Sequence, residues 1–371
     1  MVPDEVRGGA AHPSSILSGR EGRGRTPLVA APRNHLWSPP YLYPRVAISI
    51  QPTGDKALTC GFMTPGGSRS VSPRPPGGMC CDQPVSTSTP APATSGPTRG
   101  APRATVVTIV RGRLDHLCRQ GWGLAGQDDP GLEWVVVRMG GPDPRPALQG
   151  PHPEPVLIDL DVPDGAPLPL AAARNAGIAA ATAPTVVLLD VDAVPGPTTV
   201  RRYAEAVERT GGVLAGPVSY LPAGVPTTPQ DLAAMPRAGT PHAARPVPGE
   251  GELRAEDRWE LLWTVSMAAP TALLRGSGGF DERYVGYGAE DTDMAMRLRA
   301  TGAPLHWVGG AWAYHQHHEE VGRRDRVSDI VRNASLFRET WGWWPMAGWL
   351  RDLADEGRVE WDPDGTTLRQ R

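Results

Sequence analysis

The stretch Val186-Val187-Leu188-Leu189-Asp190-Val191-Asp192 joins a short apolar run to two carboxylates that are spaced two residues apart. Residues two apart in a strand face the same side, so Asp190 and Asp192 can approach one ligand together. Paired carboxylate oxygens suit Mg²⁺ or Mn²⁺, and such an ion in turn binds a diphosphate. The alternative is a solvated strand end followed by a helix cap. The stretch predicts a buried strand at 185–189 that ends at a metal and diphosphate site.

Short apolar strands and helical segments alternate on both sides of this stretch. Strands are expected at 105–110, 133–137, 156–160, 213–218 and 305–308, and helices at 114–127, 168–181, 198–210, 290–301 and 325–340. This alternation is typical of an α/β fold with a mainly parallel sheet and helices on both faces, whose ligands bind at the carboxyl ends of the strands. Residues 221–257 are rich in Pro, Ala and Gly, which indicates a functional lid or a mobile insertion.

Composition divides the chain of 371 residues into three parts. Residues 1–103 lack an apolar period and are rich in Pro, Gly, Ser, Thr and Arg, which predicts disorder or an over-extended gene start. Residues 104–320 carry the α/β pattern, and residues 321–371 are expected to form a helical, Trp-rich extension. The net charge of -3 gives no support for a nucleic-acid partner.

Cysteine use and hydropathy bear on the compartment. Three of the four cysteines lie before residue 104, and Cys118 is alone in the expected folded part, which argues against a disulfide framework. No apolar run approaches the roughly 18 residues of a transmembrane helix, and the N-terminus lacks the apolar region of a signal peptide. A cytoplasmic protein is expected, and any membrane association would be peripheral.

A second informative stretch, Gly-Gly-Phe-Asp-Glu-Arg-Tyr-Val-Gly-Tyr-Gly-Ala-Glu-Asp-Thr-Asp, occupies residues 278–293. Acidic residues are common in the first turn of a helix because the helix dipole favours them by about 0.3–1 kcal/mol each, so Glu290 and Asp291 have a structural explanation. However, the preceding glycines allow the backbone to turn tightly and to approach a ligand closely. A carboxylate held there can take a proton from a hydroxyl, which makes Asp291 and Glu290 catalytic candidates.

Three histidines follow in His315-Gln316-His317-His318, and His315 is the expected metal ligand, against the alternative of a polar surface turn. Arg111, Arg113 and Arg174 can pair with diphosphate oxygens, although surface arginines are common in this chain. The tryptophans between 341 and 349 can stack on sugar rings or simply pack a C-terminal element.

These motifs together resemble a GT-A-fold glycosyltransferase of the broad family 2 type over residues 104–320. The segment 278–293 is similar to the G-G-F-D-E…G-x-G-x-E-D-x-D element of the galactosyltransferase C-terminal region, and the D-x-D strand end resembles that of family 2 enzymes. The resemblance implies an inverting, metal-dependent transfer of a sugar from a nucleoside-diphosphate sugar to an acceptor hydroxyl of a carbohydrate or small molecule. A UDP-sugar is the favoured donor, with a GDP-sugar as the second option.

Residue roles follow from the same resemblance. It implies that Asp192 and His315 bind Mn²⁺ or Mg²⁺ and that Asp291, beside Glu290, is the general base. It assigns donor binding to a further set, which comprises Arg111, Arg113, Arg174, Asn175, Asp190 and Gly279. Two positions depart from the family pattern: Asp143 follows a Gly-Gly-Pro turn where an acid usually reads the nucleobase, and Trp312 stands where related enzymes have a soft metal ligand.

Two other functions remain open from the sequence. A sugar-phosphate nucleotidyltransferase shares the sheet and the strand-end carboxylates, but it needs a phosphate-binding loop that Arg111-Gly112-Arg113 matches poorly. A non-catalytic carbohydrate-binding relative would keep the fold without turnover, and the complete set of acids and His315 argues against it.

Overall fold

The computed structural model describes residues 57–59, 101–129, 131–150, 152–226, 228–318 and 326–371. The predicted disorder of residues 1–103 therefore falls almost entirely outside the described residues. Residues 57–59 form a short strand, β1, and the next described residues lead into the α/β domain.

The first half of the α/β domain follows the predicted alternation of strands and helices. Its elements are β2 (Ala104–Val110), α1 (Leu114–Ala125), β3 (Leu132–Met139), the 3₁₀ helix η1 (Arg145–Ala147), β4 (Pro155–Leu160), α2 (Leu170–Ala180), β5 (Thr185–Leu189), β6 (Ala193–Pro195) and α3 (Thr199–Thr210). Each predicted element in this half occurs within a few residues of its expected bounds. This agreement reflects two apolar patterns: β2 and β5 are continuous apolar runs that are buried along their length, and α3 is strongly amphipathic.

The second half mixes short elements with longer connections. It contains β7 (Val213–Ala215), β8 (Val218–Tyr220), η2 (Pro229–Ala234), α4 (Met235–Ala238), β9 (Thr240–Pro241), β10 (Leu253–Glu256), η3 (Trp259–Leu261), β11 (Ser266–Pro270), α5 (Thr271–Gly276), α6 (Glu290–Ala300), β12 (Leu305–Val308) and β13 (Ala313–His315). Helices α7 (Val327–Trp341) and α8 (Ala347–Asp355) and strands β14 (Val359–Trp361) and β15 (Leu368–Gln370) complete the described chain.

Among the described residues, the main sheet has nine strands in the order β1-β4-β3-β2-β5-β11-β7-β12-β10. Strands β1, β4, β3, β2 and β5 run parallel to one another, and β7 runs parallel to β12. Strand β11 is antiparallel to β5 and β7, and β10 is antiparallel to β12. The predicted α/β class with a mainly parallel sheet is therefore confirmed. The carboxyl ends of β2 and β5 lie side by side, which brings residues 111–113 and 190–192 to the same edge.

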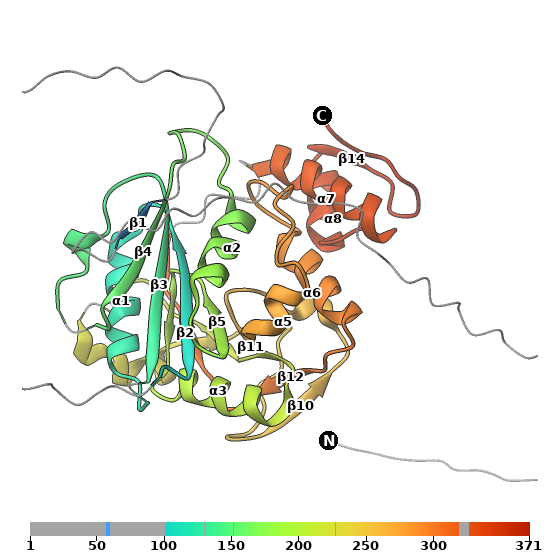
Figure 1. The fold of residues 1–371 in the computed structure, drawn as a ribbon. Helices are drawn as coiled ribbons and strands as arrows, with labels where there is room; N and C mark the ends of the chain where they lie inside the picture. Colours follow the sequence, from blue (N-terminus) through green and yellow to red (C-terminus); the bar gives the residue numbers. More distant parts are fainter. Residues whose placement is uncertain (1–56, 60–100, 130, 151, 227, 319–325) are drawn as a thin grey trace, which may run out of the picture. The chain divides into compact units, whose positions relative to one another are not determined.

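Helices cover both faces of this sheet, and Figure 1 shows α1 and α2 on opposite sides of it. Alternate residues of β2 face different cores: Val107 and Ile109 pack with α2 and α6, whereas Val106 and Val110 pack with α1 and α3. Gly177 on α2 is in close contact with β2, since a Cβ there would lie 2.2 Å from the Val107 side chain. The period of two along each strand thus produces the two cores.

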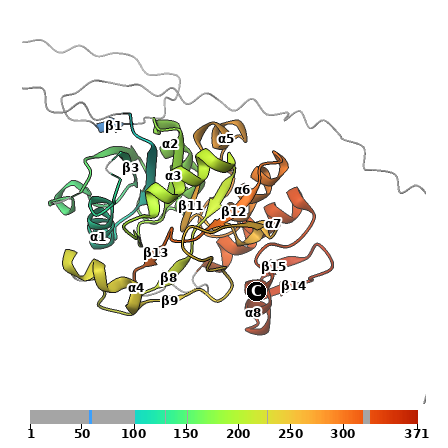
Figure 2. The same ribbon diagram turned by 90° about the horizontal axis from the view of Figure 1, so that it is seen from below.

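A second sheet lies at the carboxyl edge of the main sheet and has the order β6-β13-β8-β9 (Figure 2). The predicted single strand at 213–218 is wrong, because the chain divides there between β7 in the main sheet and β8 in the small one. Gly216 and Pro217 separate the two strands. Proline lacks the N–H that a central strand donates, and a Cβ at Gly216 would lie 2.1 Å from the Ala311 carbonyl oxygen.

Residues 221–257 contain more structure than the predicted lid or insertion. Strand β10 pairs with β12 at the edge of the main sheet, and β9 pairs with β8 in the small sheet. Met235 of α4 is buried in a small core with Leu221 and Tyr314. Each of these elements spans only two to six residues. Such short elements among prolines and glycines show no apolar period in the sequence.

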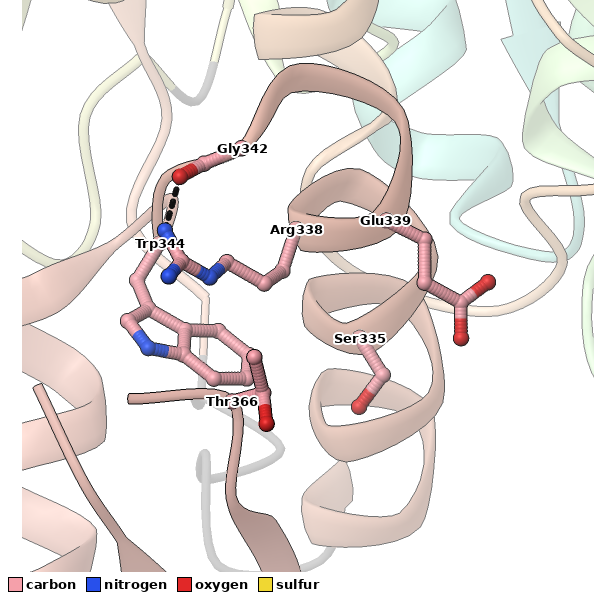
Figure 3. Close-up of a pocket in the computed structure, with 6 residues that line it drawn as sticks. All are labelled: Ser335, Arg338, Glu339, Gly342, Trp344 and Thr366. Atoms are coloured by element: carbon pink, nitrogen blue, oxygen red, sulfur yellow. Dashed lines mark hydrogen bonds between the residues drawn. The ribbon is translucent and has the colours of Figure 1, made fainter. Parts of the chain in front are cut away.

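The C-terminal elements build a core of their own around α7 and α8, with Ile330, Trp344 and Leu350 at its centre. Figure 3 shows a cavity of about 460 Å³ here, lined by Ser335, Arg338, Glu339, Gly342, Trp344 and Thr366. None of the predicted site residues lines this cavity. Across the described part of the chain, no helix combines the length and the apolar character that a membrane span requires.

Candidate active site

One buried arginine brings the two acidic motifs together. Arg174 on α2 is 5% exposed, and its Nη2 lies 3.2 Å from Asp190 Oδ1 at the end of β5. Its Nη1 lies 3.2 Å from Glu290 Oε1 and 3.6 Å from Asp291 Oδ1, both in the first turn of α6. The guanidinium also stacks over the ring of Phe280, 5.5 Å from its centroid. A single cation therefore contacts three carboxylates from two segments that are a hundred residues apart in sequence.

The charges of this cluster do not balance, since three carboxylates share one guanidinium. Burial, reinforced by the charge of Asp291, raises the pKa of Glu290 to about 7 although Arg174 acts in the opposite direction. The enclosed position of Asp190 likewise raises its pKa, and the charges of Asp192 and Asp291 add to this effect. Asp190 thus interacts with the carboxylates of both motifs. Three carboxylates against one guanidinium leave this group with excess negative charge, which adds to burial in raising the two pKa values.

Asp291 has a second set of partners on the strand side. Thr264, just before β11, donates its backbone N–H to Asp291 Oδ2 at 3.2 Å and its hydroxyl to Oδ1 at 2.9 Å. These two donors fix the plane of the carboxylate, and 24% of the Asp291 side chain remains exposed. Glu290 is buried instead, and its Oε2 accepts the backbone N–H of Gly288 at 3.1 Å. The accessible acid of the pair is therefore Asp291.

The glycine segment before α6 is held by Asn175 on α2. The Asn175 side chain donates to the Phe280 carbonyl at 2.9 Å and accepts the Phe280 N–H at 2.8 Å. Gly279 adopts φ +69°, and a Cβ on it would lie 2.5 Å from Asn175 Oδ1. Both residues were predicted to bind the donor. The structure gives each a clear local contact, while donor binding stays a prediction.

A second cluster lies on the small sheet around Asp192, which is 7% exposed. His315 ends β13 directly beside Ala193 of β6, so its Nε2 lies 3.6 Å from Asp192 Oδ1. His318 Nε2 lies 3.2 Å from Asp192 Oδ2, which also accepts a hydrogen bond from Arg113. The ligand atoms of the aspartate and the two histidines all lie within 4.8 Å of one another. This arrangement offers one oxygen and two nitrogen donors to a cation.

Positive groups determine the electrostatics of Asp192. Burial acts to raise its pKa, but the hydrogen bond from His318 and the charges of His315 and Arg113 outweigh burial and hold the pKa at about 2. The buried Gln120 of α1 fixes the backbone between Asp190 and Ala193, because its side-chain amide donates to the carbonyls of these two residues at 2.7 and 2.9 Å. Asp192 is thus an ionised carboxylate in a rigidly held segment.

The remaining predicted residues lie around these clusters. Arg111 donates to the carbonyls of Met139 and Pro163 at 3.2 and 3.3 Å and pairs with Asp164 at 2.7 Å, so it joins the strand ends of the main sheet. Arg113 reaches Asp192, as described above. Asp143 is exposed and accepts hydrogen bonds from Arg145 at 3.0 Å. The donor-binding role of Arg111, Arg113 and Arg174 stays a prediction.

Sequence reasoning did not select two residues that the structure brings into the site. His318 was visible in the histidine cluster, but only the path of the chain after β13 shows that it reaches Asp192. Thr264 carries no local signal, because a threonine before a strand is common. Its contact with Asp291 depends on the pairing of β11 with β5 and on the packing of α6 against η3.

Comparisons with known proteins match parts of the chain. Residues 167–259, which include Arg174, Asp190 and Asp192, match the family model described as Glycosyl transferase family 2. A validoxylamine A glucosyltransferase of Streptomyces hygroscopicus subsp. jinggangensis (strain 5008) is 28% identical over 195 residues, which cover 45% of this chain and 44% of the relative. A hyaluronan synthase of Pasteurella multocida is 28% identical over 189 residues, 44% of this chain and 19% of the synthase.

Solved structures of S. aureus TarS align with part of the chain. The structure of its residues 1–349 aligns with a TM-score of 0.45 and 17% identity, over 64% of this chain and 65% of that one. The chain spans less than half the length of the curated relatives that it matches. These matches agree with the sequence-based recognition: residues 167–259 are similar to Glycosyl transferase family 2, and a relative over 45% of the chain is named as a glucosyltransferase.

Proposed function

We propose that this protein is a metal-dependent, inverting glycosyltransferase that moves a sugar from a nucleoside-diphosphate sugar to an acceptor hydroxyl. The main support is the position of Asp190 between the two clusters. It follows β5 directly and lies two residues before Asp192, and Arg174 contacts both its carboxylate and that of Asp291. A candidate metal site and a candidate base thus lie at the same edge of the sheet. The relative that is named as a glucosyltransferase supports the same reaction class.

The residues around Asp192 fit a divalent cation. One carboxylate and two imidazoles within 4.8 Å are an oxygen and nitrogen donor set that suits Mn²⁺, which we favour, or Mg²⁺ with added water. Asp192, His315 and His318 would hold the ion, where the sequence predicted Asp192 and His315 alone. A bound cation would supply positive charge against the departing diphosphate. Arg113 adds a permanent positive charge to the same cluster.

Asp291 is the proposed general base. Its carboxylate is partly exposed and is oriented by the two hydrogen bonds from Thr264, so one oxygen lone pair can face the acceptor hydroxyl. It would accept the proton as the hydroxyl attacks the anomeric carbon from the face opposite the diphosphate. Glu290 is buried against Arg174 and Gly288, and it would support Asp291 and not contact substrate.

The donor is proposed to be a UDP-sugar, with a GDP-sugar as the second option. Thermal unfolding of the full chain would be measured with UDP, GDP and dTDP, each with and without Mn²⁺. A ligand that binds only the folded state raises its stability by mass action. We expect stabilisation by one nucleotide only when Mn²⁺ is present. Release of pyrophosphate from a nucleoside triphosphate and a sugar phosphate would instead support a nucleotidyltransferase.

Neighbouring histidines provide a matched test of the metal site. His318→Ala is expected to abolish the Mn²⁺-dependent stabilisation, whereas His317→Ala should retain it because the His317 side chain is exposed and lies outside the cluster. Equal behaviour of the two variants would remove His318 from the site.

The base has its own test. Asp291→Asn keeps an oxygen for the Thr264 hydroxyl, so nucleotide and Mn²⁺ should still stabilise the variant. Turnover of the donor sugar should fall by about 10²–10⁴-fold, the usual contribution of a general base. Near-normal turnover would show that another group takes the proton.

A further inference from the structure

Aromatic rings form a continuous row on the small sheet. Tyr220 of β8 and His315 of β13 are direct cross-strand partners, and their rings stack with centroids 4.7 Å apart. Tyr220 also meets His242, just after β9, at 5.7 Å, and His242 meets Trp263 at 5.0 Å. Tyr220 pairs with Thr240, and His242 lies two residues further on, so the register places these side chains on one face.

The two ends of this row coincide with the two parts of the candidate active site. At one end, His315 belongs to the Asp192 cluster. At the other end, Trp263 is followed by Thr264, which binds the carboxylate of Asp291 through its N–H and hydroxyl. The row therefore connects the position proposed for the departing diphosphate with the group proposed to deprotonate the acceptor.

A buried arginine, Arg245, packs against the Trp263 end of this row. Arg245 is 4% exposed, and its guanidinium stacks over Trp263 at 5.1 Å and over Trp307 at 4.8 Å. Its Nη2 donates to the Gly216 carbonyl at 3.2 Å, while Nε and Nη1 have no hydrogen-bond partner within the described chain. The Trp263 N–H is also fixed, because it donates to the Glu260 carbonyl at 3.1 Å.

The accessible side of the row combines apolar ring surface with a hydrogen-bond donor, as a sugar-binding surface requires. Tyr220 is 39% exposed, whereas Trp263 and His242 are half-buried. His242 Nδ1 accepts the Ala244 N–H at 3.2 Å, so Nε2 carries the proton of the neutral ring and can donate to a hydroxyl. A pyranose ring has one face of C–H groups and a rim of hydroxyls, which matches aromatic rings that alternate with a polar donor.

We propose that Tyr220, His242 and Trp263 form the acceptor subsite and that the acceptor presents a pyranose ring to it. This inference rests on the proposed glycosyltransferase function and specifies its second substrate as a carbohydrate. The ring would stack on Tyr220 and Trp263, with the reacting hydroxyl directed toward Asp291. Acyclic polyols carry the same hydroxyl groups without the apolar ring face, so they should bind poorly.

The test is NMR of the full chain with ¹⁵N-labelled tryptophan indoles, saturated with diamagnetic Mg²⁺, because Mn²⁺ at His315 would broaden nearby resonances, and with UDP, GDP or dTDP, whichever stabilises it. Methyl β-D-glucopyranoside and methyl β-D-galactopyranoside would be titrated in, with sorbitol as the acyclic comparison. The indole resonance of Trp263 would be assigned from its absence in Trp263→Phe. We expect at least one glycoside to shift this resonance, whereas sorbitol should leave it unchanged. Tyr220→Ala should weaken this binding by roughly three- to tenfold, the range for loss of one aromatic contact, and Tyr220→Phe should restore it.

Trp343→Ala is the matched control, since Trp343 is 38% exposed but belongs to the C-terminal region. It should leave the titration midpoint unchanged. An unchanged midpoint in Tyr220→Ala, or an equal response to sorbitol, would overturn the subsite. If neither glycoside shifts Trp263 while nucleotide and Mn²⁺ still stabilise the protein, the subsite is wrong but the proposed function stands. A glycoside response in a protein that binds no nucleotide would overturn the acceptor role itself.

Discussion

Replacement of Arg174 by methionine would remove the one cation that three carboxylates share. Arg174 lies within 3.2 Å of Asp190 and Glu290 and 3.6 Å of Asp291, and its side chain is 7% exposed. Removal of one partner from a buried ion pair costs about 3–5 kcal/mol, because the remaining charge is left uncompensated. We expect Arg174→Met to lower the free energy of unfolding by this amount at pH 8. That is a large part of the roughly 5–15 kcal/mol that a domain has in total.

The loss should depend on pH in a defined direction. The pKa of Glu290 is already raised from 4.5 to about 7, and loss of the guanidinium would raise it further. An acid whose folded pKa exceeds its unfolded value adds stability that is complete below the unfolded pKa and is lost as the pH rises through the folded pKa. The deficit of Arg174→Met should therefore be smaller at pH 5.5 than at pH 8. Urea unfolding followed by tryptophan fluorescence measures both values.

Arg201→Met is the matched control for this experiment. Arg201 also contacts two carboxylates, Asp128 at 2.8 Å and Glu205 at 3.0 Å, but all three side chains lie at the surface. Exposed ion pairs contribute about 0.2–1 kcal/mol, so this variant should lose little at either pH. An Arg174→Met deficit as small as that of Arg201→Met, or one that is equal at both pH values, would refute the argument that a buried, charge-rich cluster depends on this residue.

Three further outcomes are expected from the same contacts. Gly279→Ala should lower the free energy of unfolding in urea by more than Gly278→Ala. Both glycines have positive φ, where an alanine costs about 1–2 kcal/mol of backbone strain. Only a Cβ at Gly279 would also meet a carboxamide oxygen, at 2.5 Å. The pKa of Glu290 is raised in the folded state, so the free energy of unfolding of the wild type should contain a contribution that decreases between pH 4.5 and about 7. Glu290→Gln should remove this contribution, and an unchanged pH profile would contradict the assignment. Trp341→Phe should cost about 1.5–3 kcal/mol in thermal or urea unfolding, since its N–H donates to the buried carboxylate of Asp293 at 2.8 Å, and no change would show that this bond is unimportant.

The elements of the fold were largely predictable, because their signals are local. Strands β2 and β5 are buried along their whole length and β3 along most of it, while β4 is buried only at its centre. All four contain apolar runs with β-branched residues, and α3 and α6 end at or near glycines. The prediction failed where two strands belong to different sheets. Gly216 and Pro217 mark that boundary, but a glycine-proline pair inside an apolar run does not show which sheet each half will join.

The site was predictable as a set of residue types and less so as a set of contacts. Asp190, Asp192, Asp291 and His315 were selected from short motifs, and the structure places them at one edge of the sheet. The partners that determine their chemistry come from distant elements. Arg174 was predicted to bind a diphosphate, yet in this structure its guanidinium contacts three carboxylates. Such pairing depends on helix and strand packing, which the local sequence does not encode.

The two clusters of the candidate site differ in their charge balance, and this difference fits the proposed reaction. Around Asp192 the cationic and imidazole groups outnumber the single carboxylate, and the pKa of Asp192 is held at about 2. Around Arg174 the carboxylates outnumber the cation, and the pKa of Glu290 is raised to about 7. Sugar transfer places negative charge on the departing diphosphate and releases a proton from the acceptor. The diphosphate would then leave toward Arg113 and the cation proposed at Asp192, and the proton would enter the carboxylate-rich cluster, where it relieves repulsion among the acids.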